Sequence, residues 1–285
     1  SELYSLGYFK ILYYEIHTLS PNEVDVIFHV EETQLRKFHL GLRWDNYYNL
    51  VGVANVQLTS DLFPGIRIED QIQVAGINKN EFAISYPSRR LNFPIYPYLK
   101  ITNLRSPFRH YSIQALEGLY TYSSDKIRMG FGLFLKNYWN TEFEYFWKKS
   151  GLQSEENLEN PLDKDNINEY LGIRIMVQLD LLDNVLLPKD GIFIKGKHEN
   201  SRTELGSRHN YEFYQAWGRI YKTFRLNTYG ISGYHHRATF NTPLYMTTIF
   251  DGSKIFAGTK AFQLHGSSLT FFRLDYRYKH KKDIY

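Results

Sequence analysis

The sequence predicts an all-β protein, an antiparallel transmembrane β-barrel of about twelve strands preceded by a short hairpin. Three observations predict this fold: 17% of the residues are aromatic, the mean hydropathy is negative, and apolar and polar residues alternate over long segments. Large aromatic side chains normally fill an apolar core, so a negative mean hydropathy requires polar residues interleaved with them. A barrel wall meets this requirement because lipid-facing and lumen-facing residues alternate along each strand.

The alternation is clearest between Leu171 and Leu181, where every odd position carries Leu, Ile or Val and the even positions carry Gly, Arg, Met, Gln and Asp. The same period of two recurs over residues 38–45, 66–74 and 271–278. A soluble β-sandwich would also alternate. Its strands, however, are typically about five or six residues long, whereas segments of about ten residues match a tilted membrane crossing.

The polar faces of these segments carry charges that a barrel would direct into its lumen. Glu142 and Glu144 share one strand face, and a polar lumen explains them better than general acid–base catalysis does. Tyrosine and tryptophan recur near the predicted strand ends, as at Trp44 and Trp139, which is typical of the two lipid interfaces. The side chains that we expect in the lumen are Arg43, Arg67, Glu69, Arg174, Asp180, Arg273 and Asp275.

Twelve segments qualify as crossings, an even number as in bacterial single-chain barrels. The acidic residues 154–168 lack periodicity and predict a long exterior loop, and residues 241–266 form a second long connection. There is no run of about eighteen apolar residues that would cross as a helix, so only a closed barrel would span a bilayer. The predicted crossings are 36–46, 49–60, 66–76, 95–105, 109–122, 127–136, 139–150, 168–183, 189–200, 209–225, 226–240 and 268–281.

The first residues differ from the rest. Leu6–Ile16 and Val24–Val30 indicate two short strands joined by the turn Ser20-Pro21-Asn22. Such a hairpin is too small to be stable alone. We therefore expect a hairpin at residues 1–33 and the barrel at residues 34–285. No signal peptide is visible in residues 1–10, which predicts a mature product or a piece of a longer chain.

Several function classes find no support in the residues. The chain has no cysteine, and hence no disulfide or thiolate metal site. The net charge of +4 is small and the basic residues are scattered, so we expect no nucleic-acid partner. The adjacent His235 and His236 would point to opposite faces of a strand and cannot share one metal ion. We expect neither a metal nor a cofactor.

The sequence also lacks the Gly-x-Ser-x-Gly elbow of serine hydrolases, and its nearest serine cluster, Gly266-Ser-Ser, has no second glycine. We therefore expect that this chain is not an enzyme.

Three motifs resemble one family. Leu6-Gly-Tyr-Phe-Lys10 followed by Val24–Glu31 resembles the closing hairpin of a POTRA domain, the periplasmic module that precedes the barrel in the outer-membrane protein assembly factor superfamily. Leu179-Asp180 followed by Pro188-Lys-Asp-Gly191 is similar to the mid-barrel signature of that superfamily. Phe250–Thr259 occupies the place of its lumen loop, with Gly252, Phe256, Ala257 and Gly258 as the matching residues. Among members, the chain most resembles the barrels found behind patatin-like phospholipase domains.

The sequence departs from the family pattern at three points. Ala257 stands where the lumen loop usually has Arg. Family barrels have sixteen strands, whereas this chain ends one strand after the loop, which indicates a barrel shortened at its C-terminus. If the partner of the usual Arg lies on the missing strands, the loss of both is consistent, because a buried unpaired guanidinium is costly. Only the last part of one POTRA module is present.

The resemblance implies a barrel in the bacterial outer membrane, in contact with membrane lipids, that anchors or translocates a partner or handles lipid without catalysis. A narrow twelve-stranded lumen would be largely filled by side chains. The shortened wall further implies an altered seam at which the first and last strands pair, and a homo-oligomer, a dimer or trimer, that shields it. Two alternatives stay open: a passive pore for small solutes, and a soluble β-rich binding protein that would be extracted without detergent.

Overall fold

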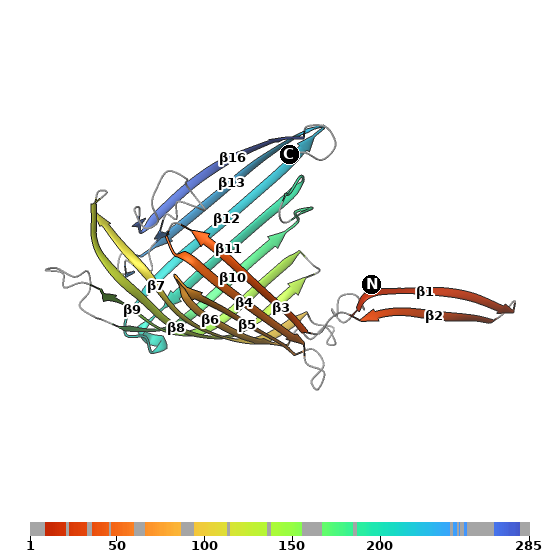
Figure 1. Cartoon of the computed structure of the whole chain (residues 1–285), viewed down its shortest axis with the longest axis horizontal. Coiled ribbons are helices and arrows are strands. Elements are labelled where there is room, and N and C mark those ends of the chain that lie inside the picture. The colour runs from red at the N-terminus through yellow and green to blue at the C-terminus, as the bar shows by residue number, and fades with distance from the viewer. Residues whose placement is uncertain are drawn as a thin grey trace.

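The computed structural model shows one large antiparallel sheet and a separate hairpin (Figure 1). Among the residues described, no helix is long and apolar enough to cross a bilayer. The described residues are 9–20, 23–32, 36–45, 47–59, 66–86, 94–112, 115–135, 138–155, 167–184, 187–239, 242–243, 245, 248–249 and 265–279.

The hairpin consists of β1 (Phe9–Ser20) and β2 (Glu23–Glu32), which pair antiparallel and extend away from the large sheet (Figure 1). Large apolar side chains on it, such as Tyr14 and Phe28, are exposed. A hairpin of only two strands cannot bury both of its faces, which explains this exposure. The two predicted strands are thus present, and their assignment to a POTRA domain stays a prediction.

The large sheet contains twelve strands, each hydrogen-bonded to its neighbours in chain order. A two-stranded sheet of β14 (Thr248–Ile249) and β15 (His265–Gly266) lies in the connection before the last strand. In spatial order the twelve are β3 (Arg36–Asp45), β4 (Asn49–Thr59), β5 (Arg67–Ala75), β6 (Asn78–Ser85), β7 (Ile95–Ser112), β8 (Ala115–Leu135), β9 (Trp139–Ser154), β10 (Asn168–Asp180), β11 (Gly191–Ser201), β12 (Tyr211–Phe224), β13 (Asn227–Ala238) and β16 (Ser268–Tyr278).

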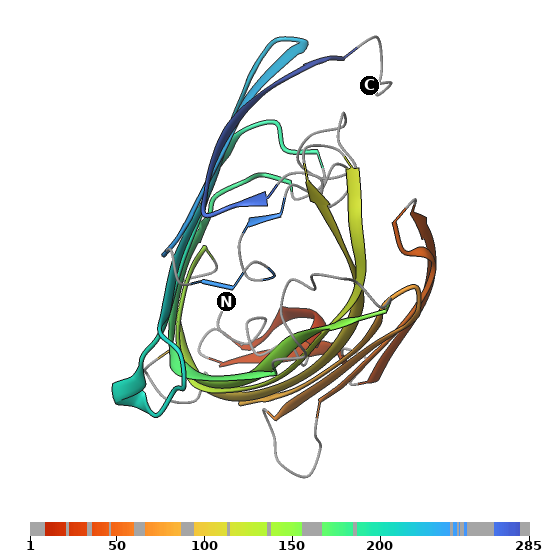
Figure 2. The same ribbon diagram turned by 90° about the vertical axis from the view of Figure 1, so that its left-hand side faces the viewer.

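Seen from its end, the sheet curls around an interior (Figure 2). Strands β3 and β16 form its two edges, and their described residues do not pair with each other. The fold class predicted from the sequence, an antiparallel barrel wall of twelve strands behind a hairpin, is confirmed. The pairing of the first and last strands stays a prediction.

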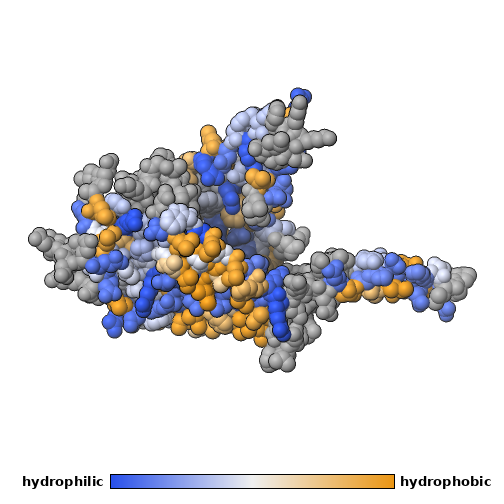
Figure 3. Space-filling view, viewed as in Figure 1, coloured by the Kyte–Doolittle hydropathy of each residue, from blue (hydrophilic) through white to orange (hydrophobic). Residues whose placement is uncertain are grey.

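The two faces of the sheet differ in chemistry, as the alternation predicted. Apolar residues such as Leu42 and Leu274, each 79% exposed, lie on the outer face. Figure 3 shows such side chains gathered over the part of the outer face that β3, β4 and β5 form. The register of β10 against β9 keeps Ile173 and Ile175 beside Tyr145 and Phe143 on that face. The outer face is therefore an apolar surface suited to hydrocarbon.

Two errors in the predicted strands compensate for each other. The three segments predicted at 95–105, 109–122 and 127–136 are the two long strands β7 and β8. Pro107 and Asp125 looked like loop residues, but both remain paired, Pro107 with Thr121 and Asp125 with Asn103.

The second error is β6, which was missed because it opens with the polar run Asn78-Lys-Asn-Glu81. It follows β5 after the short turn Gly76-Ile77, and the N–H of Gly76 donates to the carbonyl of Leu50 on β4 over 3.1 Å. A short polar segment after a glycine reads as a loop when the pairing strand is unknown.

The turn between β10 and β11 gives the Pro188-Lys-Asp-Gly191 motif a structural reason. Gly191 has a φ of 118°, and a Cβ there would lie 2.1 Å from the carbonyl oxygen of Leu181. The carboxylate of Asp183 accepts the N–H groups of Lys189 and Asp190 over 2.8 and 3.1 Å. Desolvation raises the pKa of Asp183, but these N–H donors outweigh it, so the pKa falls below its usual value.

We predict that Gly191→Ala lowers the free energy of unfolding by about 1–3 kcal/mol, because any L side chain is strained at this φ and meets backbone. The matched control is Gly196→Ala on the same strand, where a Cβ has nothing within 4 Å. Urea unfolding in lipid vesicles, followed by tryptophan fluorescence, measures both. Equal stabilities of the two variants would contradict the role of Gly191.

Candidate functional site: the charged inner face

The inner face of the sheet carries charged side chains on neighbouring strands from β6 to β11. Strand alternation directs them inward, and the antiparallel register brings residues far apart in sequence side by side. Lys100 on β7 stands opposite Arg128 on β8, and Gly130 on β8 stands opposite Glu144 on β9. The result is a set of ion pairs that crosses the strands.

Glu81 on β6 marks one end of this set. Its carboxylate lies 3.1 Å from Nζ of Lys79 and 3.6 Å from Nζ of Lys100. The guanidinium of Arg128 approaches Glu81 to 3.6 Å and Glu144 to 3.8 Å. Arg128 thereby links β6 to β9 across β7 and β8.

Glu144 is the most deeply buried carboxylate of this group, with a side chain 1% exposed. Nε of Arg174 lies 3.0 Å from it, and a second nitrogen of the same guanidinium lies 3.5 Å from Glu142. The hydroxyl of Tyr98 donates to Glu144 over 2.8 Å. Four cations, Lys79, Lys100, Arg128 and Arg174, thus share three carboxylates, so that each buried charge has a partner, as burial requires.

A second cluster surrounds Glu199 on β11, which is 2% exposed. Its carboxylate lies 3.1 Å from Nζ of Lys126 and 3.7 Å from Nζ of Lys197, and it accepts the hydroxyl of Tyr211 over 2.6 Å. The buried Lys148 also interacts electrostatically with Glu199. Three lysines therefore face one carboxylate, and this part of the inner wall is positively charged.

Aromatic rings pack around these lysines. Nζ of Lys126 lies 4.4 Å from the ring centre of Phe146, and Nζ of Lys197 lies 4.5 Å from that of Phe213. Both rings belong to a buried cluster with Tyr170 and Tyr211. Such faces stabilise ammonium groups that have lost water.

Tyr245, in the connection between β13 and β16, packs onto the same wall. Its hydroxyl lies 3.1 Å from that of Tyr170 and donates to the carbonyl of Ser150 over 3.3 Å. Its ring lies 5.3 Å from that of Tyr122. This part of the connection lies against the inner face. The predicted lumen-loop residues Gly252, Phe256, Ala257 and Gly258 fall outside the described residues.

The residues predicted for the lumen do not form one site. Arg174 joins the network of Glu142 and Glu144. Arg67 and Glu69 form an ion pair with each other on β5, and both side chains are exposed by more than 40%.

Arg273 and Asp275 pair over 3.1 Å on the edge strand β16, where the hydroxyl of Tyr221 donates to Asp275 over 3.2 Å. Arg43 lies over the ring of Tyr48 at 5.9 Å. Asp180 caps the turn after β10 by accepting the N–H of Leu182 over 3.2 Å.

The lysine cluster was not predicted from the sequence. Lys195, Lys197 and Glu199 alternate with Ile194, Gly196 and His198, which is the same period-two pattern used elsewhere. This alternation predicts that Lys195, Lys197 and Glu199 point inward. It is hard to recognise because two of the three residues on the outward face, Gly196 and His198, are not apolar. Within the ranges that the structure describes, no group of three or more metal-ligating side chains is close enough to hold an ion.

We predict that Glu144→Gln lowers the free energy of unfolding by about 1–3 kcal/mol, because Arg128 and Arg174 each lose one of two carboxylate partners in a buried site and keep Glu81 and Glu142, respectively. Glu69→Gln is the matched control in an exposed pair and should change it by less than about 1 kcal/mol. Equilibrium unfolding in urea tests both. A small effect for Glu144→Gln would mean that water reaches the network.

Comparisons with known proteins agree with this architecture. A scan against protein-family models finds no match, and neither does a search of curated proteins. Among solved structures, the chain is similar to BamA from Haemophilus ducreyi lacking POTRA domains 1–3, with a TM-score of 0.72 and 11% identity over 96% of this chain. The match spans 59% of that BamA chain.

OmpT, an outer membrane protein of Vibrio cholerae, matches with a TM-score of 0.47 and 10% identity over 93% of this chain and 87% of that one. At these identities the likeness concerns the fold alone. The chain has the fold of a bacterial outer-membrane β-barrel, and the outer membrane is the location that this fold and the apolar outer face indicate.

Proposed function

We propose that this chain is a barrel of the outer-membrane assembly and transport superfamily that anchors or positions a partner, or handles lipid, without catalysis. The observation that carries the proposal is the network of ion pairs and packed rings on the inner face. Ion pairs join β6 through β10 across that face, and aromatic rings pack beside them. A wall built in this way is a rigid support rather than a lining for flowing water.

The finer family assignment is part of the same proposal. A relation to the barrels behind patatin-like phospholipase domains would make this chain the membrane anchor of an enzyme carried on a separate segment. The absence of a Gly-x-Ser-x-Gly elbow from the sequence supports this division of labour. The hairpin β1–β2 supports a POTRA-like connection on the periplasmic side, because it precedes the first wall strand directly.

A passive pore is the second candidate, and one observation favours it. Cations outnumber carboxylates on the inner face, most clearly where Lys126, Lys148 and Lys197 face Glu199. An open lumen with this charge would attract small anions and concentrate them.

We expect no steady conductance in planar bilayers, because the ion pairs and rings on the inner face should narrow the lumen of a twelve-stranded barrel. Phe213→Ala removes a buried ring and should introduce measurable steps, which shows that an open lumen is detectable in the same assay. Steady, anion-selective conductance in the unmodified chain, reduced by Lys126→Gln, would instead support the pore.

The two edges of the wall suggest a homo-oligomer, a dimer or trimer. Leu42 on β3 and Leu274 on β16 are among the most exposed apolar side chains, and each lies on an edge strand. Exposed strand edges with apolar side chains readily pair with further strands. Association of copies would cover these edges.

Because the chain contains no cysteine, single substitutions report contacts without background. We predict disulfide-linked dimers for Leu42→Cys in native membranes, and few for Ile173→Cys in the middle of the wall. The double variant Leu42→Cys/Leu274→Cys additionally reports pairing of the two edges within one chain. If every variant gives only monomeric products, the proposed homo-oligomer is contradicted.

A further inference from the structure

The inner face of β11, β12 and β13 contains a pocket of about 310 Å³ that differs from the networks described above. We propose that it binds a phosphate-bearing amphiphile, with the phosphate between Lys195, Lys197 and Arg219 and the hydrocarbon along Trp217. This inference goes beyond the proposed function and does not depend on it, because it rests only on the wall formed by these strands.

The basic side chains of the pocket lack the compensation seen elsewhere on the wall. Among the described residues, neither Lys195 nor Arg219 forms an ion pair. Lys197 lies 3.7 Å from Glu199, but that carboxylate is held more closely by Lys126 at 3.1 Å. The nearby Asp275 is paired with Arg273. Three cations therefore line one cavity, and the only carboxylate paired with any of them is Glu199, among the described residues.

The hydrogen-bond donors at the pocket point to the same ligand chemistry. Nε of Arg219 and Nε1 of Trp217 are both buried, and neither has an acceptor in the part of the chain that the structure describes. Buried N–H groups normally have a hydrogen-bond acceptor. The guanidinium is held by stacking, 4.8 Å from the ring centre of Phe193 and 5.9 Å from that of Trp217. A guanidinium held in this way matches two oxygens of a phosphate.

The strand register explains how these groups meet. Lys195 pairs with Trp217, and Trp217 pairs with Tyr234, so that one cation and two rings form a row across three strands. Phe193 pairs with Arg219 in the next row. Rings and cations thus alternate around the cavity, and the ligand needs both an anionic group and an apolar body.

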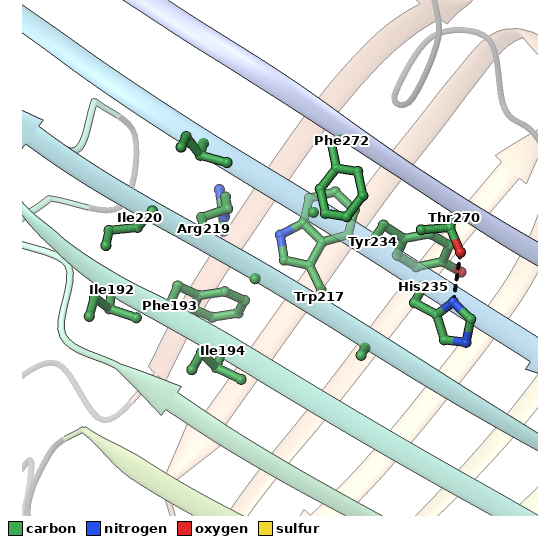
Figure 4. A pocket seen from close by; sticks show the side chains of 14 residues that line it. Ile192, Phe193, Ile194, Trp217, Arg219, Ile220, Tyr234, His235, Thr270 and Phe272 are labelled. Atoms are coloured by element: carbon green, nitrogen blue, oxygen red, sulfur yellow. Dashed lines mark hydrogen bonds between the residues drawn. The ribbon is translucent and has the colours of Figure 1, made fainter.

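The apolar body is indicated by the rings of Phe193, Trp217 and Tyr234, which line the pocket beside its cations, and the outer side of the same strands is a separate surface. A depression of about 450 Å³ lies there, lined by Ile192, Ile194 and Phe272 (Figure 4). Phe193, Trp217, Arg219 and Tyr234 line this depression as well as the inner pocket. Gly218 and Gly233, which pair with each other, carry no side chains, so the outer depression extends down to the sheet, whose hydrogen-bonded strands separate it from the inner pocket.

The test uses the full chain folded in a nonionic detergent, with dodecyl phosphate as the probe and native mass spectrometry or calorimetry as the readout. We expect one bound dodecyl phosphate per chain. Arg219→Gln and Lys195→Gln should each weaken binding by about tenfold, the usual effect of losing a charged hydrogen bond. Lys37→Gln, which removes one inner-face charge from the distant strand β3, is the matched control and should leave binding within about twofold.

Other outcomes would overturn the proposal. Absence of binding to the unmodified chain would rule out the site. Equal losses of affinity for Lys37→Gln and Arg219→Gln would mean that only the overall positive charge of the wall attracts the probe. If inorganic phosphate binds as tightly as dodecyl phosphate, the pocket is a site for a free anion, and an amphiphile as its ligand is ruled out. Heat-dependent gel migration verifies that each variant is folded, and Arg219→Lys, which keeps the charge but loses the fork, should bind with intermediate affinity.

Discussion

The structure depends on one constraint: every strand of the wall separates two environments with opposite demands. Hydrocarbon requires that the backbone hydrogen bonds are complete and that the outward side chains are apolar, while the interior accepts charges only if they are paired. The twelve neighbouring strands satisfy the backbone along the whole sheet between its edges. The period of two then distributes the side chains, so Ile173 and Ile175 face outward while Arg174 between them faces Glu144.

Charge pairing on the inner face follows from this separation. Glu81, Glu142 and Glu144 lie on β6 and β9, the neighbouring strands bring Lys100, Arg128 and Arg174 inward, and no carboxylate of this group stays without a cation. The network therefore orders five strands, β6 to β10, relative to one another. Around Glu199 the balance changes, because three lysines share one carboxylate, and aromatic faces replace the missing anions. The ion pairs are thus most extensive over β6 to β10, and the excess of positive charge is greatest around Glu199.

The sequence was sufficient for the fold, because a period of two is a local property that a chain such as Leu171–Leu181 displays without knowledge of its partners. It was not sufficient for features that depend on contacts between residues far apart in the sequence. Whether Pro107 or Asn80 belongs to a strand is decided by the neighbouring strand, and whether Glu144 meets Arg128 or another cation is decided by register. Arg174 and Arg273 were both expected in the lumen, yet one enters a buried network and the other an exposed pair at the edge. The sequence therefore shows which residues point inward, but it does not show which residues they pair with.

The same reasoning explains why β11 to β13 stand apart. On β9 and β10, large outward side chains such as Phe143, Tyr145 and Ile173 cover the wall. On the inner side of these strands, the carboxylates of Glu142 and Glu144 pair with Arg174. On β12 and β13 the outward positions Gly218 and Gly233 are bare, and the inward Arg219 has rings rather than carboxylates beside it. Neither change helps stability, since one removes packing and the other leaves a buried cation without an anion. An anionic group bound on the inner face would compensate Arg219, and hydrocarbon of the surrounding membrane would fill the outer depression beside Gly218 and Gly233.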